Sequence, residues 1–251
     1  MVTQHNNTKD ALVFSYHQLR QAIGVLGIAL PLILFVGGML ALSDLRPSIS
    51  AYFNTVFRDI FVGIMCAIGV FLLAYRGYAC DRENGEWVSD RALSFIAGVS
   101  AIGIALFPVK RNMCMTDETD VSVCDVGVQE VETLSQLILG AGIAELFHYG
   151  FALAFFVSLI GFSLIKFPKS RQNGRRKIYL WSGIILVGVT AGLLATFFLG
   201  RKDGAVKASI KEAEIVFWLE AIGIWAFGVA WLTKGKADIA LRWAARHRRQ
   251  N

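Results

Sequence analysis

The stretch "QAIGVLGIALPLILFVGGMLAL" (residues 21–42) decides the fold class, because it contains no charged residue. A helix needs about 20 predominantly apolar residues to cross roughly 30 Å of hydrocarbon. Pro31 lies inside the stretch, and no small-residue cleavage site follows Leu42. We therefore expect a retained transmembrane helix here and not a cleaved signal peptide.

Five further apolar blocks follow, and the whole chain is 55% hydrophobic with 18% charged residues. Backbone groups in lipid must be hydrogen-bonded internally, so the blocks are helices, and the shorter alternating segments of an outer-membrane barrel are absent. The sequence predicts an all-α fold, a single membrane domain over residues 1–251 built as a polytopic bundle of six transmembrane helices. The predicted spans are residues 21–42, 56–75, 92–108, 145–167, 178–200 and 213–232.

Lys and Arg residues predict the orientation of these spans. If both termini are cytoplasmic, 17 of the 25 basic residues fall in inner segments and 8 in outer segments. This bias follows the positive-inside rule, so we predict cytoplasmic termini and a bacterial inner (plasma) membrane. The net charge of +6 then reflects basic cytoplasmic loops and not a nucleic-acid partner. Membrane lipids are the expected partners, and a homo-oligomer stays open.

The long extracytoplasmic loop, residues 109–144, contains two of the four cysteines, Cys114 and Cys124. An oxidising compartment would let them form a disulfide. The alternative is two free thiols. The other cysteines, Cys66 in a span and Cys80 in an inner loop, have no such partner.

Amphipathic and glycine-rich segments flank or fill the spans. Residues 10–21 and 237–249 are amphipathic and basic, which suits an anionic inner membrane surface, although the second also fits a solvated tail that only sets topology. Residues 128–150 predict a helix in the outer interface, with Gly140 and Gly142 at the bend into the fourth span. Small residues in "GVLGIAL", "GVSAIG" and "GVTAG" favour close helix packing over a functional role.

Ionisable residues inside spans are few, and they usually face a bundle interior or a cavity. Glu220, Asp59 and His148, with Glu145 one turn before His148, all fall in the outer half of the membrane. One outward-facing pocket would explain them together. The ligand-binding candidates of this pocket are Ser48, Ser50, Tyr52, Arg58 and Glu145.

Simpler explanations compete with this pocket. Asp59 also fits neutralisation of Arg58, or stabilisation of its own helix N-terminus. His148 also fits an interfacial residue hydrogen-bonded to a neighbour.

A serine hydroxyl, a histidine and a carboxylate are the parts of a nucleophilic site. His148, Asp59 and Glu220 are the catalytic candidates, with Ser48 or Ser50 as the hydroxyl. No nucleophile-elbow, Walker, dinucleotide or haem motif is visible, so we expect no cofactor. Only four histidines exist, and His5, His17 and His247 fall on the inner side, which disfavours a multi-histidine zinc site.

The order of these features resembles a six-span superfamily that includes the DRAM autophagy modulators, the GPI-anchor lipid-remodelling proteins and bacterial relatives. Ile49 and Ser50 match an Ile-Ser-Asp motif after the first span, where Ala51 stands in place of the Asp. The other matches are "IAGVSAIGIALFP" in the third span, "HYGFALAFF" from His148, and Glu220 in the last span. The resemblance implies a lipid-associated role on the outer side of the membrane.

Three functions follow as hypotheses. The first is binding of a lipid or lipid-linked headgroup in the outward pocket, with remodelling of its acyl chain if the site is catalytic. In that case His148 is the acid/base, and Asp59 or Glu220 orients it. The second is a transporter or channel subunit in which Glu220 relays protons or cations. The third is a non-catalytic membrane adaptor.

Overall fold

The structure, a computed structural model, describes residues 2–42, 44–75, 77, 88–109, 133–169 and 173–235, with only the backbone described at 2–15, 169 and 173. These residues form helices and no strands. The α-helices are α1 (Val2–Ala41), α2 (Arg58–Ala74), α3 (Asp90–Leu106), α4 (Leu134–Leu139), α5 (Ala141–Gly161), α6 (Asn173–Lys202), α7 (Gly204–Glu212) and α8 (Ile215–Lys234). Three short segments are helices of other types: the 3₁₀ helices η1 (Ser50–Asn54) and η3 (Phe167–Lys169), and the π-helix η2 (Phe162–Lys166).

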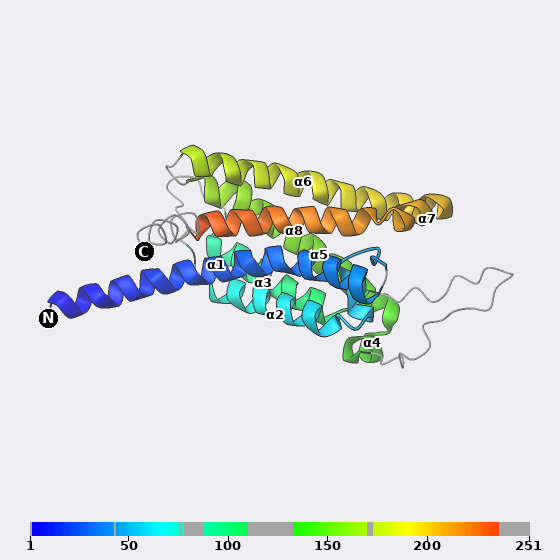
Figure 1. Cartoon of the computed structure of the whole chain (residues 1–251), viewed down its shortest axis with the longest axis horizontal. Helices are drawn as coiled ribbons and strands as arrows, with labels where there is room; N and C mark the ends of the chain where they lie inside the picture. The colour runs from blue at the N-terminus through cyan, green and yellow to red at the C-terminus, as the bar shows by residue number, and fades with distance from the viewer. Residues whose placement is uncertain are drawn as a thin grey trace.

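The long helices run side by side as a bundle (Figure 1). Helix α1 packs on α8, α2 on α3, α3 on α5, and α6 on α8. The short helices α4 and α7 lie at one end of the bundle, which we call the α4/α7 end. The start of α1 and the close of α8 lie at the other, which we call the termini end (Figure 1).

Four helices are long and apolar enough to cross a membrane: Tyr16–Ala41, Ala141–Lys166, Gly174–Lys202 and Ile215–Lys234. Many of their large apolar side chains point away from the bundle, as with Leu40, Val157 and Trp181, all more than half exposed. Such a surface suits hydrocarbon better than water. The helical membrane character predicted from composition is therefore supported, with four candidate spans.

Helix bounds differ from the predicted spans mainly at the ends. Helix α1 continues back to Val2 because residues 2–20 contain no Gly or Pro to break it. Helix α3 starts at Asp90, where the Ser89 side chain accepts from the Ala92 backbone N–H. The predicted loop at 109–144 contains α4 and the start of α5, and Gly140, with φ of 80°, makes the bend between them.

Glycines allow two helix pairs to touch through their backbones. A Cβ at Gly24 of α1 would lie 2.9 Å from the Gly228 carbonyl oxygen of α8, and a Cβ at Gly228 would lie 2.9 Å from that of Gly24. Gly69 and Gly98 pair α2 with α3 in the same way. Any side chain would separate these helices, so the small residues do serve packing, as the pattern predicts.

The predicted Cys114–Cys124 disulfide lies outside the described residues. So do Cys80 and the amphipathic segment 237–249. Cys66 is described and is a free thiol.

Candidate functional site

The segment between α1 and α2 is held against α8 at the α4/α7 end. The Phe217 backbone N–H donates to the Pro47 carbonyl oxygen over 3.0 Å. The Ile49 backbone N–H donates to a carboxylate oxygen of Glu220 over 2.6 Å. Both bonds join residues about 170 positions apart, so the first turn of η1 is positioned by the last helix of the bundle.

Ser50, at the start of η1, meets His148 of α5. The Ser50 Oγ lies 2.9 Å from His148 Nε2, and His148 Nδ1 lies 2.6 Å from the Phe107 carbonyl oxygen. Ser50 is 7% exposed and His148 is 2% exposed. We call Ile49, Ser50, Phe107, His148 and Glu220 the serine–histidine cluster.

The partners of His148 determine the direction of these bonds in its neutral form. A carbonyl oxygen only accepts, so Nδ1 must carry the proton that it donates to Phe107. Nε2 then presents a lone pair, which accepts the Ser50 hydroxyl proton. A hydroxyl that donates to an oriented imidazole has the geometry of a nucleophile–base pair. The orienting group is a backbone carbonyl and not a carboxylate.

Glu220 serves the backbone of the same segment. Its carboxylate interacts with the N–H groups of both Ile49 and Ser50, at the start of the η1 turn. Amide groups at a helix start lack partners within the helix, and a carboxylate satisfies them. Glu220 therefore caps η1, and it reaches His148 only through Ser50.

The other predicted ligand-binding residues of the segment are near the cluster but outside its hydrogen bonds. Ser48 Oγ accepts from the Ala51 backbone N–H over 3.0 Å and closes the turn. The Tyr52 ring is fully buried and packs between Phe57 and Phe217, and burial raises the pKa of its hydroxyl. The Arg58 guanidinium stacks over the Phe53 ring at 4.3 Å.

Asp59 does not join His148. Its side chain is exposed in the first turn of α2, and it forms no hydrogen bond or ion pair with any described residue. Its position at a helix N-terminus agrees with the simpler explanation, since a carboxylate there stabilises the helix dipole. Glu145 instead accepts from the Tyr149 hydroxyl over 3.1 Å, on the outer surface of α5 beside His148.

An apolar groove of about 440 Å³ runs between α3 and α5 close to the cluster. Its walls include Phe95, Val99, Phe147, Gly150 and Phe151. The rings of Phe147 and Phe151 stack on the ring of Phe107, with centroids 5.3 and 5.5 Å apart, and the Phe107 carbonyl holds His148. Two residues of the groove wall therefore contact the residue whose carbonyl orients the histidine.

Sequence reasoning missed Phe107 and the groove. Phe107 acts through its backbone carbonyl. Because every residue has that group, the sequence distinguishes Phe107 only by its place at the end of the third predicted span. The groove depends on how two helices cross. Among the described residues no three His, Cys, Asp or Glu side chains are grouped to hold a metal ion.

Comparisons with known proteins give no match: no protein-family model, no curated protein and no solved structure is similar to this chain. The function must therefore be argued from the cluster itself.

Proposed function

We propose that this protein binds a membrane lipid, or a lipid-linked headgroup, at the serine–histidine cluster. The observation that carries the proposal is the 2.9 Å contact between Ser50 Oγ and His148 Nε2 inside an apolar bundle. Ser50 donates to His148 and keeps acceptor capacity on its oxygen, which suits a hydroxyl or ammonium group of a headgroup. Arg58, Glu145 and Tyr149 provide polar groups nearby.

The proposed topology has six spans with cytoplasmic termini. Helices α2 and α3 have 17 residues each, at the lower limit of about 17 for a crossing, and they pack alongside the four longer spans. The basic-residue bias favours a cytoplasmic termini end. The serine–histidine cluster would then face the outer leaflet of a bacterial inner membrane. Cysteine labelling of Ser209→Cys in α7 from outside intact cells, with the four native cysteines replaced by Ser, tests this arrangement, because labelling only after permeabilisation would contradict it.

The groove between α3 and α5 provides the place for an acyl chain. Its lining is almost entirely apolar, and its wall residue Phe147 packs on the Phe107 ring. A chain lying in it would bring the glycerol or ester region of its lipid close to His148. Membrane lipid is the occupant that fits, because α5 is one of the helices apolar enough to span.

Acyl transfer is the second candidate function, and the His148 tautomer favours it. Ser50 Oγ would attack an ester carbonyl carbon as its proton passes to Nε2. The alcohol would leave with that proton, and water or a lipid hydroxyl would then release the acyl group from Ser50. The Ile49 amide, a potential oxyanion donor, is bonded to Glu220. Use of that amide as the oxyanion donor would require the bond to open, whereas binding does not.

The resemblance to the six-span lipid-associated superfamily fits this proposal. Three of its four short motif matches contain Ile49–Ser50, His148 and Glu220, and these residues contact one another in the cluster. A relay function for Glu220 receives less support, because its carboxylate is engaged in capping η1. An adaptor function would give these contacts no role beyond stability.

Mass spectrometry of lipids that copurify with the full chain tests the proposal. Gly150→Leu should fill the groove, because a Cβ at Gly150 has no neighbour within 4 Å. Gly188→Leu on α6 is a matched control, since its Cβ is also unobstructed and faces outward. We expect several-fold less bound lipid in Gly150→Leu and the wild-type amount in the control.

Two further variants probe the polar end of the site. His148→Ala and Ser50→Ala should change which headgroups copurify, while Ser158→Ala, a buried serine bonded within α5, should not. Lipid profiles that are identical in all variants would contradict the proposal. For acyl transfer, a fluorophosphonate probe should label wild type and not Ser50→Ala.

A further inference from the structure

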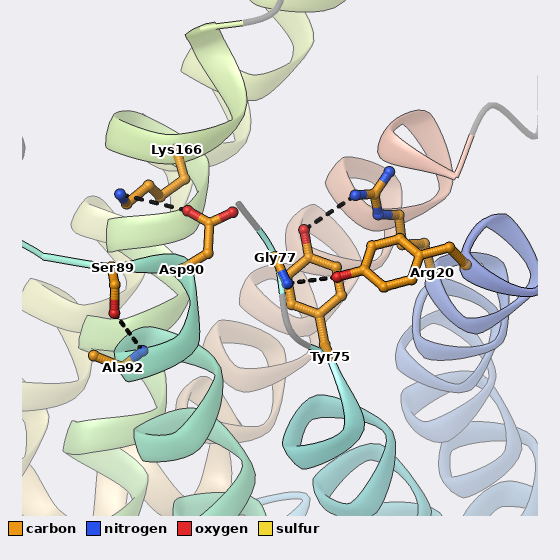
Figure 2. A network of polar contacts seen from close by, with 8 residues as sticks. Arg20, Tyr75, Gly77, Ser89, Asp90, Ala92 and Lys166 are labelled. Atoms are coloured by element: carbon orange, nitrogen blue, oxygen red, sulfur yellow. Dashed lines mark hydrogen bonds and ion pairs between the residues drawn. The ribbon is translucent and has the colours of Figure 1, made fainter. Parts of the chain in front are cut away.

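A second polar cluster lies at the termini end, where Arg20 of α1 is 6% exposed (Figure 2). Its Nη2 donates to the Tyr75 hydroxyl over 3.3 Å. Its guanidinium also lies over the rings of Tyr16 and Tyr75, 4.8 and 5.4 Å from their centroids. These partners are neutral, so the positive charge has no opposite charge among them.

Arg20 forms no ion pair with any carboxylate in the described part of the chain. Asp90, the carboxylate of this end, is paired with Lys166 over 3.4 Å. Lys234 lies close enough to interact with both Arg20 and Asp90, and it adds a like charge beside Arg20. A buried guanidinium without an anion is costly, the more so in a bundle that spans lipid.

Two buried donors of this cluster lack acceptors among the residues that the structure describes. They are Arg20 Nε and Nε1 of Trp231, whose side chain is 0% exposed. The Trp231 ring packs 5.0 Å from the ring of Tyr75, the residue that Arg20 contacts. Guanidinium and indole N–H groups only donate, so they cannot satisfy each other. A ligand with several acceptor oxygens and a negative charge is the kind of group that satisfies such donors.

We propose that Arg20 and Trp231 are donors of a phosphate-binding site at the termini end of the bundle. The planar guanidinium matches the spacing of phosphate oxygens, and Lys234 beside it favours an anion with more than one charge. The phosphate belongs either to a lipid headgroup or to a free anion. Trp231 and Glu220 are eleven residues apart on α8, about 16 Å along the axis, so this site is separate from the serine–histidine cluster.

The test is ligand-dependent thermal stability of the full chain, stripped of lipid in an uncharged detergent. The probes are inorganic phosphate, dioleoyl phosphatidylglycerol, and dioleoylglycerol as a lipid without phosphate. Saturation at about 100 times Kd should raise the Tm by roughly 5 °C or more. A shift with both phosphate-bearing probes indicates a site open to free anions, and a shift with phosphatidylglycerol alone indicates a headgroup site.

Variants test whether the rise in Tm depends on Arg20 and Trp231. Arg20→Gln should abolish it, and Trp231→Phe, which removes only the N–H, should weaken binding about tenfold. Arg201→Gln is the matched control, since Arg201 is exposed and also stacks on an aromatic ring, that of Phe197 at 5.5 Å. If Arg20→Gln does not fold, the ligand-dependent Tm of Trp231→Phe tests the proposal in its place. The proposal is overturned if no probe raises the Tm of wild type, or if the Tm rises equally in wild type, Arg20→Gln and Trp231→Phe. An equal rise with dioleoylglycerol, which has no phosphate, would also overturn it.

Discussion

The two polar clusters lie at opposite ends of one apolar bundle, and they satisfy their buried groups differently. In the serine–histidine cluster, a carboxylate and a carbonyl oxygen accept from N–H donors, and the hydroxyl meets the imidazole lone pair. In the cluster around Arg20, two buried donors lack acceptors in the described part of the chain, and the guanidinium contacts two tyrosine rings and a hydroxyl.

This difference indicates how each end responds to a ligand. The serine–histidine cluster is complete without one, so a ligand there must add to or replace an existing bond. The cluster around Arg20 has buried donors available, so an acceptor adds bonds without breaking any. Buried polar networks stabilise a fold only when their members are satisfied. The termini end should therefore be more sensitive to bound anions.

The largest expected effect comes from removing the Asp90 carboxylate at the termini end. Asp90→Asn leaves Lys166 without its paired carboxylate in a buried site, which should cost about 3–5 kcal/mol. Thermal unfolding in detergent measures the loss. The double variant Asp90→Asn, Lys166→Met should recover much of it, because it removes both charges. If the double variant is no more stable than the single one, the ion pair is not the source of the loss.

His148→Ala tests the α4/α7 end in the same assay. It leaves Ser50 and the Phe107 carbonyl without their shared partner and opens a cavity, for an expected loss of about 3 kcal/mol. Ser158→Ala should cost less than about 1 kcal/mol, because that hydroxyl bonds only to the Ala154 carbonyl within its own helix. Equal losses in the two variants would show that His148 does not hold the elements together.

Glu220 variants separate capping from proton relay. Glu220→Ala removes the acceptor of the Ile49 N–H and should cost about 1–3 kcal/mol, whereas Glu220→Gln keeps an acceptor oxygen and should cost less. A capping role predicts that lipid binding survives in Glu220→Gln. A relay predicts a loss of proton or cation flux in proteoliposomes with the same variant, at unchanged stability. That second result would favour transport.

The smallest expected effect concerns Glu214, which precedes α8. It has φ of 50°, a left-handed conformation that favours glycine, so Glu214→Gly should raise stability by about 1 kcal/mol. Partial burial, with Asp44 nearby, also raises the pKa of Glu214. Wild type should therefore gain stability relative to Glu214→Gly as the pH falls through that raised pKa, since the folded state binds the proton more tightly. A gap between the two Tm values that is the same at every pH would contradict this.

Several parts of the candidate site could be predicted from the sequence. His148 and Glu220 stand out because polar groups in apolar helices are costly, and Ser50 stands out among the polar residues between the first two spans. The order of the spans predicts that all three lie at one end. Asp59 was placed in the same group by the same reasoning, yet it is exposed on α2. Depth along a helix can be read from sequence, whereas the direction of a side chain around it depends on which neighbours pack there.

Arg20 shows the same limit. In the sequence it precedes an apolar run and looks like an ordinary basic residue at the inner membrane surface. Its burial follows from packing of α1 against α8, where Gln21 donates to the Gly235 carbonyl and Gly24 contacts Gly228. At that depth Arg20 meets Tyr75 at the end of α2, whose ring in turn packs on Trp231 of α8.

The sequence by itself determined that the chain forms apolar helices long enough for a membrane, and where most of them begin and end. Those properties belong to contiguous residues, through length, hydropathy and capping side chains. Only the tertiary structure decided that Ser50 meets His148, 98 residues away, and that Glu220 caps Ile49, 171 residues away. Such pairs depend on helix packing, which is a property of the whole bundle and not of any one segment.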